Sequence, residues 1–69
     1  MTQKERISQY MDEFGSITAL EAMRDLGIMR LASRISEMIQ SGMNITKDTV
    51  SSRNRYGETT HYARYRKVQ

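Results

Sequence analysis

Residues 17–42 read ITALEAMRDLGIMRLASRISEMIQSG, and this stretch decides the fold. Thr18 followed by Glu21 is the pattern of a capping box, in which each side chain accepts a hydrogen bond from the other residue's backbone N–H. An apolar stripe at helical spacing follows, made of Leu20, Met23 and Leu26. Gly27 then supplies a residue suited to the left-handed conformation that ends many helices. The pattern predicts a helix over about residues 19–26.

A second amphipathic pattern begins directly after this glycine. Its apolar residues recur at helical spacing and are Ile28, Met29, Leu31, Ile35, Met38 and Ile39. Because Gly42 follows, the spacing predicts a helix over about residues 29–41. Two helices joined by a tight turn that contains a glycine have the layout of a helix-turn-helix.

The segment before this stretch predicts one more helix, over about residues 3–14. Thr2 and Glu5 form another capping-box pattern, and the apolar stripe consists of Ile7, Tyr10, Met11 and Phe14. Tyr10 and Phe14 are expected in the core, as are the methionines Met11, Met23, Met29 and Met38. Ser16 and Ile17 bridge the first two helices and leave room for a very short strand.

The last third of the chain changes to the pattern of strands. Residues 45–52 are rich in Thr, Val and Ser, and residues 59–68 contain Tyr62, Tyr65, Thr and Val among polar residues. Between them, Gly57 allows a turn. The pattern predicts an antiparallel hairpin over about residues 45–68. Ala63 and Tyr65 are expected to face the core, opposite a face that carries Tyr62, Arg64 and Arg66.

Three helices followed by a two-stranded hairpin are the order of a winged helix-turn-helix, an α+β and mainly α fold. The runs that carry a closer resemblance are Ile17–Ala22, Leu26–Ile28 and Arg30–Ile35, followed by Gly42 and Ile45. In these runs the chain resembles the small winged helix-turn-helix proteins encoded by bacteriophages, prophages and other mobile elements of bacteria. The resemblance covers nearly all of one expected domain, residues 1–69. It implies DNA binding, with the third helix in the major groove and the hairpin as the wing.

Composition excludes several other classes of protein. The 69 residues include no cysteine and one histidine, so no Cys/His metal site or thiol nucleophile is expected. No phosphate loop or nucleophile elbow occurs, and no enzyme activity, catalytic residue, metal or cofactor is predicted. No apolar run is long enough for a membrane span or signal peptide, so no membrane partner is expected. The resemblance implies the bacterial host cytoplasm and association with the nucleoid.

Charge points to a polyanionic partner. The net charge is +3, and residues 53–69 contain five of the 11 lysines and arginines against a single acid, Glu58. A compact domain with one basic end fits nucleic acid. The first 52 residues, by contrast, carry one more acid than base.

Candidate DNA contacts lie on the predicted third helix. The face opposite Ile35 carries Arg30, Ser33, Glu37 and Gln40, with Arg34 on its flank. Arginine pairs with guanine, and glutamine with adenine, through two hydrogen bonds in the major groove. Glu37 would repel phosphates unless it accepts from a cytosine or pairs with an arginine. A solvated helix face is the alternative interpretation.

The wing and one helix start add further candidates. Arg53, Asn54 and Arg55 sit at the hairpin tip, where arginine suits phosphates or a narrow minor groove; a charged tip that keeps the hairpin soluble is the alternative. Thr18 caps a helix and offers backbone N–H groups to a phosphate. Arg64 would steer DNA over a longer range; a solvated strand face is the alternative. Tyr56 would either stack on a sugar or base or pack beneath the hairpin.

The function predicted on these grounds is sequence-specific binding of double-stranded DNA by a small regulator of transcription or accessory factor of a phage or mobile element. A single module buries a small interface, so a homodimer on DNA is expected for tight binding. The alternative function is a protein-interaction module that binds or inhibits a host protein, which the acidic first 52 residues favour. Binding to RNA, or to duplex shape alone, is a third and weaker hypothesis.

Overall fold

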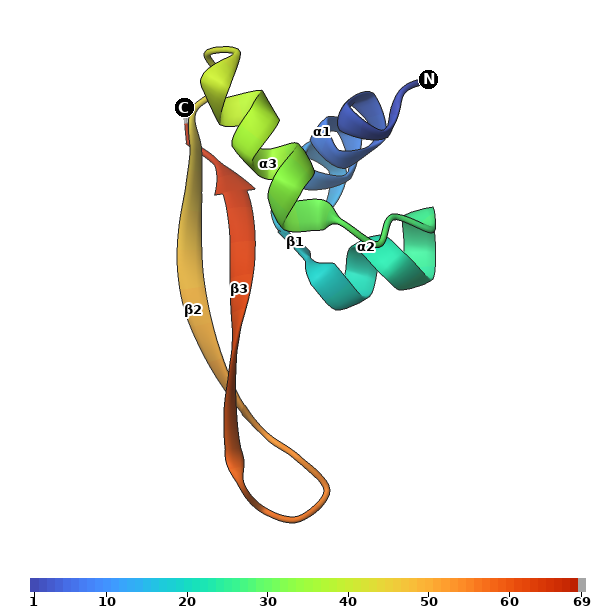
Figure 1. The fold of residues 1–69 in the computed structure, drawn as a ribbon. Helices are drawn as coiled ribbons and strands as arrows, with labels where there is room; N and C mark the ends of the chain where they lie inside the picture. Colours follow the sequence, from blue (N-terminus) through green and yellow to red (C-terminus); the bar gives the residue numbers. More distant parts are fainter. Residues whose placement is uncertain (69) are drawn as a thin grey trace.

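Across residues 1–68, which the computed structural model describes, three helices precede an antiparallel hairpin. The elements in chain order are α1 (Gln3–Phe14), β1 (Ile17–Thr18), α2 (Ala19–Leu26), α3 (Leu31–Gln40), β2 (Ile45–Arg53) and β3 (Thr59–Lys67). Figure 1 shows the helices gathered at one end and the hairpin projecting far beyond them, which gives dimensions of 39 × 23 × 21 Å. The predicted architecture of three helices and a hairpin wing is confirmed.

Local capping fixes the first two helices as the sequence predicts. The side chain of Thr2 accepts from the backbone N–H of Glu5, and that of Thr18 from the N–H of Glu21. In both cases the glutamate accepts from the backbone N–H of the threonine in return. These bonds satisfy N–H groups that the start of a helix otherwise leaves without a partner.

The turn between α2 and α3 is longer than predicted. Gly27 has a φ of +68° and donates its N–H to Met23, while the N–H of Ile28 donates to the carbonyl of Ala22 over 3.0 Å. These bonds close α2 and bury Ile28 in the core. Met29 is consequently turned outward and is 75% exposed. The expected helix over 29–41 is therefore wrong at its start, because Arg30 is only the N-cap of α3.

The sheet has the strand order β1-β3-β2, with both pairs antiparallel. The short strand expected near residue 17 is β1, whose Ile17 lies opposite Tyr65. The predicted facing of β3 is confirmed: Ala63 and Tyr65 are half-buried, and the other face, with Tyr62, Arg64 and Arg66, is exposed.

One apolar core joins the helical part. Its buried members are Ile7, Tyr10, Met11, Ile17, Ala22, Ile28, Leu31, Ile35 and Met38. Three predicted core residues lie elsewhere: Phe14, at the end of α1, is 63% exposed with its ring 4.6 Å from that of Tyr10, and Met23 and Met29 are also exposed. In α2 the small side chain of Ala22 makes the buried contact, so its larger neighbours Leu20 and Met23 stay outside. None of the helices described between residues 1 and 68 is long and apolar enough to cross a membrane.

A hydrogen bond between the side chains of Tyr10 and Asp25 links α1 to α2. The hydroxyl of Tyr10 donates to the carboxylate of Asp25 over 2.6 Å. This bond, together with burial, raises the pKa of Tyr10 to about 12. The pKa of Asp25 is lowered, first by its hydrogen bond from Arg24 and then by the bond from Tyr10.

Replacing Tyr10 with phenylalanine should lower the free energy of unfolding by about 1 kcal/mol, the usual net contribution of one hydrogen bond. Because the pKa of Tyr10 is raised in the folded state, this stabilisation is present below pH 10 and is lost as the pH rises through about 12. Urea denaturation of both proteins should show the difference at pH 7 and a smaller difference above pH 10. An ultraviolet titration in which Tyr10→Phe retains the most alkaline tyrosine ionisation would contradict this assignment.

Candidate nucleic-acid interface

The exposed face of α3 carries no charge. The helix buries Leu31, Ile35 and Met38. Its exposed residues are Ala32, Ser33, Ser36, Ile39 and Gln40. Ser33 and Gln40 were predicted on this face, whereas Ala32, Ser36 and Ile39 were not. The prediction assumed that the buried side of the helix is centred on Ile35. Leu31 and Met38 are buried as well, and around the helix axis both lie on the same side of Ile35. The centre of the buried side is therefore rotated by roughly 30° from the predicted one.

Arg34 and Glu37 belong to a polar seam between α3 and α1 rather than to this exposed face. Arg34 donates to the side-chain oxygen of Gln3 and to the carboxylate of Glu37, each over 3.0 Å. The ammonium of Lys4 lies 3.4 Å from the same carboxylate. The hydrogen bond from Arg34, aided by Lys4, lowers the pKa of Glu37. Glu37 thus pairs with an arginine, which was one of the two roles expected for it. Gln3 and Lys4 also belong to this polar seam and were not predicted.

Arg30 and Thr18 mark the starts of the two helices of the motif. Arg30 is exposed, and within residues 1–68 no carboxylate lies within ion-pair distance of it. Thr18 is half-buried, and its hydroxyl donates to the carboxylate of Glu21 over 3.1 Å. That carboxylate occupies the positive end of α2, where a phosphate would otherwise bind. The structure therefore gives Thr18 a capping role.

At the wing tip, Asn54 organises the turn. Its side-chain oxygen accepts from the backbone N–H groups of Tyr56, over 2.9 Å, and Glu58, over 3.0 Å. Arg53 and Arg55 on either side are exposed, and neither forms an ion pair within the described part of the chain. Tyr56 is 81% exposed, so packing beneath the hairpin is excluded.

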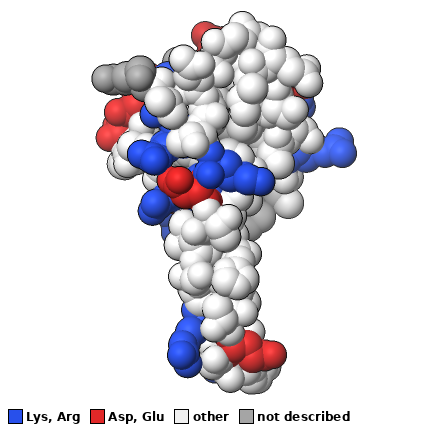
Figure 2. Space-filling model, turned by 90° about the vertical axis from the view of Figure 1, so that its left-hand side faces the viewer, with Lys and Arg blue, Asp and Glu red and all other residues white. Residues whose placement is uncertain are grey.

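The remaining basic residues of the chain end have acidic partners. Asp48 lies 2.9 Å from Arg66 and 3.8 Å from Arg64, across the outer face of the sheet. Lys67 reaches back to Asp12 of α1 over 2.8 Å. Figure 2 shows a mixed cluster of blue and red where the hairpin leaves the body, an almost uncharged stem, and charges again at the tip. Arg64 is thus remote from the tip arginines.

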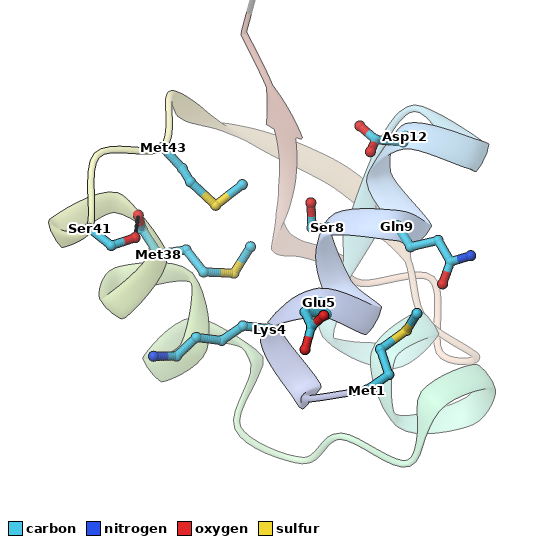
Figure 3. A pocket seen from close by; sticks show the side chains of 9 residues that line it. All are labelled: Met1, Lys4, Glu5, Ser8, Gln9, Asp12, Met38, Ser41 and Met43. Atoms are coloured by element: carbon cyan, nitrogen blue, oxygen red, sulfur yellow. Dashed lines mark hydrogen bonds between the residues drawn. The ribbon is translucent and has the colours of Figure 1, made fainter.

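A hollow lies between α1 and the end of α3. Figure 3 shows Met38 and Met43 pointing into it, with polar side chains of α1 along its other side. Nowhere in residues 1–68 do three or more His, Cys, Asp or Glu side chains form a group suited to a metal ion. The exposed face of α3 and the wing tip therefore remain the candidate interface.

Replacing Glu37 with glutamine should make the acid side of the stability profile shallower. A carboxylate with a lowered pKa stabilises the folded state above its ordinary value of 4.5, and this contribution is lost as the pH falls through the lowered value. The free energy of unfolding should therefore change less between pH 7 and a pH below 4 for Glu37→Gln than for the wild type. Glu13→Gln, which changes an exposed carboxylate of α1, is the control and should leave the profile closer to that of the wild type.

Comparison with known proteins agrees with this geometry. Residues 2–67 match the family model described as a winged helix-turn-helix domain. No match was found among the curated proteins or among the solved structures that were compared. The matched region includes all three helices and both strands of the wing. The chain therefore belongs to the winged helix-turn-helix domain family, whose members generally bind DNA.

Proposed function

We propose that the protein binds double-stranded DNA at specific sequences, as a small regulator or accessory factor of a phage or other mobile element. In this proposal α3 enters the major groove and the wing tip contacts the minor groove or the backbone. The observation that carries it is an uncharged face on α3, together with arginines that form no ion pair within residues 1–68, Arg30 before α3 and Arg53 and Arg55 at the wing tip. The role in a mobile element comes from the sequence resemblance alone.

The chemistry of the α3 face suits base edges. Gln40 can form two hydrogen bonds with adenine, and Ser33 can donate to or accept from several bases. Ile39 and Ala32 offer apolar contacts to the methyl group of thymine. With no charge on this face, sequence discrimination would come from shape and from neutral hydrogen bonds.

Three arginines, Arg30, Arg53 and Arg55, would supply the phosphate contacts that dominate affinity. Arg30, Arg53 and Arg55 form no ion pairs within residues 1–68, so they can bind phosphate without first losing a carboxylate partner. Arg64 has Asp48 nearby and would contribute only long-range attraction. Asn54 would act indirectly, by holding the turn that presents its two neighbours.

Arg34 would read a base only by exchanging its present partners. Its guanidinium lies between Gln3 and Glu37, and these bonds are partly exposed to solvent. In one alternative, Arg34 leaves Glu37 when the protein binds DNA and contacts a base. In the other, Arg34 keeps its bonds to Gln3 and Glu37 and holds α3 against α1. Glu37→Gln removes a negative charge and weakens the hold on Arg34, so the first alternative predicts tighter DNA binding by this variant.

The variant Arg53→Ala/Arg55→Ala should weaken binding to every duplex and reduce the slope of log affinity against log salt by about 2, since each phosphate contact contributes roughly 0.9. Fluorescence anisotropy at several salt concentrations measures this slope.

Gln40→Ala should weaken binding to a selected site by about 1–3 kcal/mol and leave binding to random DNA unchanged. Fluorescence anisotropy with the selected and the random duplex measures this difference.

The matched control is Arg64→Ala/Arg66→Ala, which removes the same charge from the outer face of the sheet. Its effect on the salt slope should be smaller than that of the tip variant. Equal slopes for the two double variants would overturn the assignment of the tip to phosphate contact. Absence of binding by the wild type at low salt would overturn DNA binding itself.

A protein-interaction module that binds or inhibits a host protein is the second candidate. Leu20 is 62% exposed and, together with Tyr62, lines a hollow between α2 and β3. Exposed apolar side chains at the rim of a groove are typical of sites that bind another protein. Failure to bind DNA, combined with retention of one host protein that Leu20→Ala abolishes, would favour this function.

A further inference from the structure

The outer edge of β2 is a long, open strand edge. In the order β1-β3-β2, β2 pairs on one side only, and Figure 1 shows no element beyond it. The strand runs from Ile45 to Arg53 and pairs with β3 without interruption, so no bulge bends it away. A strand edge of this length presents a row of N–H and C=O groups that can pair with another chain.

The ladder shows which residues direct their backbone groups outward. The N–H of Asn54 donates to the carbonyl of Glu58, and the N–H of Val68 to the carbonyl of Asn44, each over 2.9 Å. Even-numbered residues of this strand therefore bond to β3, because hydrogen-bonded positions alternate along an antiparallel pair. The residues whose backbone groups face outward are Ile45, Lys47, Thr49, Ser51 and Arg53.

This edge has few of the features that usually prevent pairing. The chain has no proline, and residues 49–52 of the strand carry no charge. Figure 2 shows the same feature as the almost uncharged stem of the hairpin. The protective charges on the strand are limited to Lys47 and Asp48 near one end and Arg53 at the other.

We propose that this edge pairs with the β2 edge of a second copy of the chain, antiparallel about a two-fold axis through Thr49. Charge selects the register. An axis through Asp48 would place that carboxylate opposite its own copy, and an axis through Val50 would place Lys47 opposite Arg53. Like charges directly opposite each other destabilise a strand pair.

Only the axis through Thr49 uses the whole strand. It leaves no like charges opposite one another, and all five outward-facing residues take part in hydrogen-bonded pairs. The hydrogen-bonded pairs are Ile45 with Arg53, Lys47 with Ser51, and Thr49 with Thr49 of the second copy. Thr46 then lies opposite Ser52, and Asp48 opposite Val50, in the non-hydrogen-bonded positions between them.

The resulting dimer is isologous, with a continuous six-stranded sheet and both copies of α3 on the same side of it. Each wing then lies along the partner's strand, so that the tip arginines of one copy approach the start of β2 in the other. This arrangement would stabilise a hairpin that otherwise extends beyond the helices as two strands only. The proposal goes beyond DNA binding and does not depend on it.

Sedimentation equilibrium of the full chain, from micromolar to millimolar concentration, tests the proposal. The wild type should form a reversible dimer. Thr49→Pro should weaken it, because the substitution removes an outward-facing N–H and leaves the bonds to β3 in place. Far-UV circular dichroism checks that the variant is folded. In amide exchange, Lys47, Thr49 and Ser51 should gain protection as the dimer forms.

A pair of charge variants tests the register and does not require proline. Ser51→Glu should face the partner's Lys47 and bind more tightly than Ser51→Lys, by roughly 2- to 30-fold for two symmetric pairs. Both variants lose the hydrogen bond between Ser51 and His61, so their difference does not include it. Ser52→Glu and Ser52→Lys change the net charge equally but face Thr46, and they should differ less.

Two results would overturn the proposal. One is a wild type that remains monomeric at millimolar concentration, which would also leave the edge free for an extended segment of another protein. The other is a dimer that Thr49→Pro and the Ser51 pair leave unchanged, which would locate the interface elsewhere. DNA binding that persists in a monomeric variant would keep the proposed function while rejecting dimerisation through this edge.

Discussion

Burial of the apolar stripe of α3 against α1 and α2 holds the molecule together. A chain of 69 residues has little surface to bury, and its buried residues all come from the part that ends with α3. Ile35 belongs to the stripe, and Ile7 and Ile17 are among the other fully buried side chains. Since these contacts fix the rotation of α3, they also decide which residues are available to a ligand.

The wing is attached to this core at one end only. Tyr65 and Ile45 pack against the core as partly buried residues, and Tyr65 is also paired with Ile17. Further along, the strands have only each other, and two strands alone are marginally stable in water. The turn is therefore held locally, by the side chain of Asn54, and the ribbon gains most from any partner that lies along it.

Ion pairs divide the basic residues into two groups. Several near the body have acidic partners, as Arg34 has in Glu37 and Arg66 has in Asp48. Arg30 at the turn and Arg55 at the wing tip have none within the described residues. Net charge alone does not reveal this division, although it determines where a polyanion would make its closest contacts.

Elements that depend on interactions between near neighbours could be predicted from the sequence. The capping boxes join residues three apart, Gly27 ends its own helix, and the alternation in β3 correctly oriented Tyr65, so the fold class followed from local patterns. The family resemblance added DNA binding as the expected function.

Only the tertiary structure decided how these elements face one another. It rotated α3 so that Ile39 and Ser36 are exposed, and it placed Met29 outside the helix, where the side chain is exposed, with Ile28 in the core. It also joined Arg34 to Gln3, 31 residues away, and Lys67 to Asp12, 55 residues away. Such contacts depend on packing between elements, which the periodicity of a single helix or strand does not specify. For this reason the sequence identified the candidate residues, while packing decided which of them have partners and which are free.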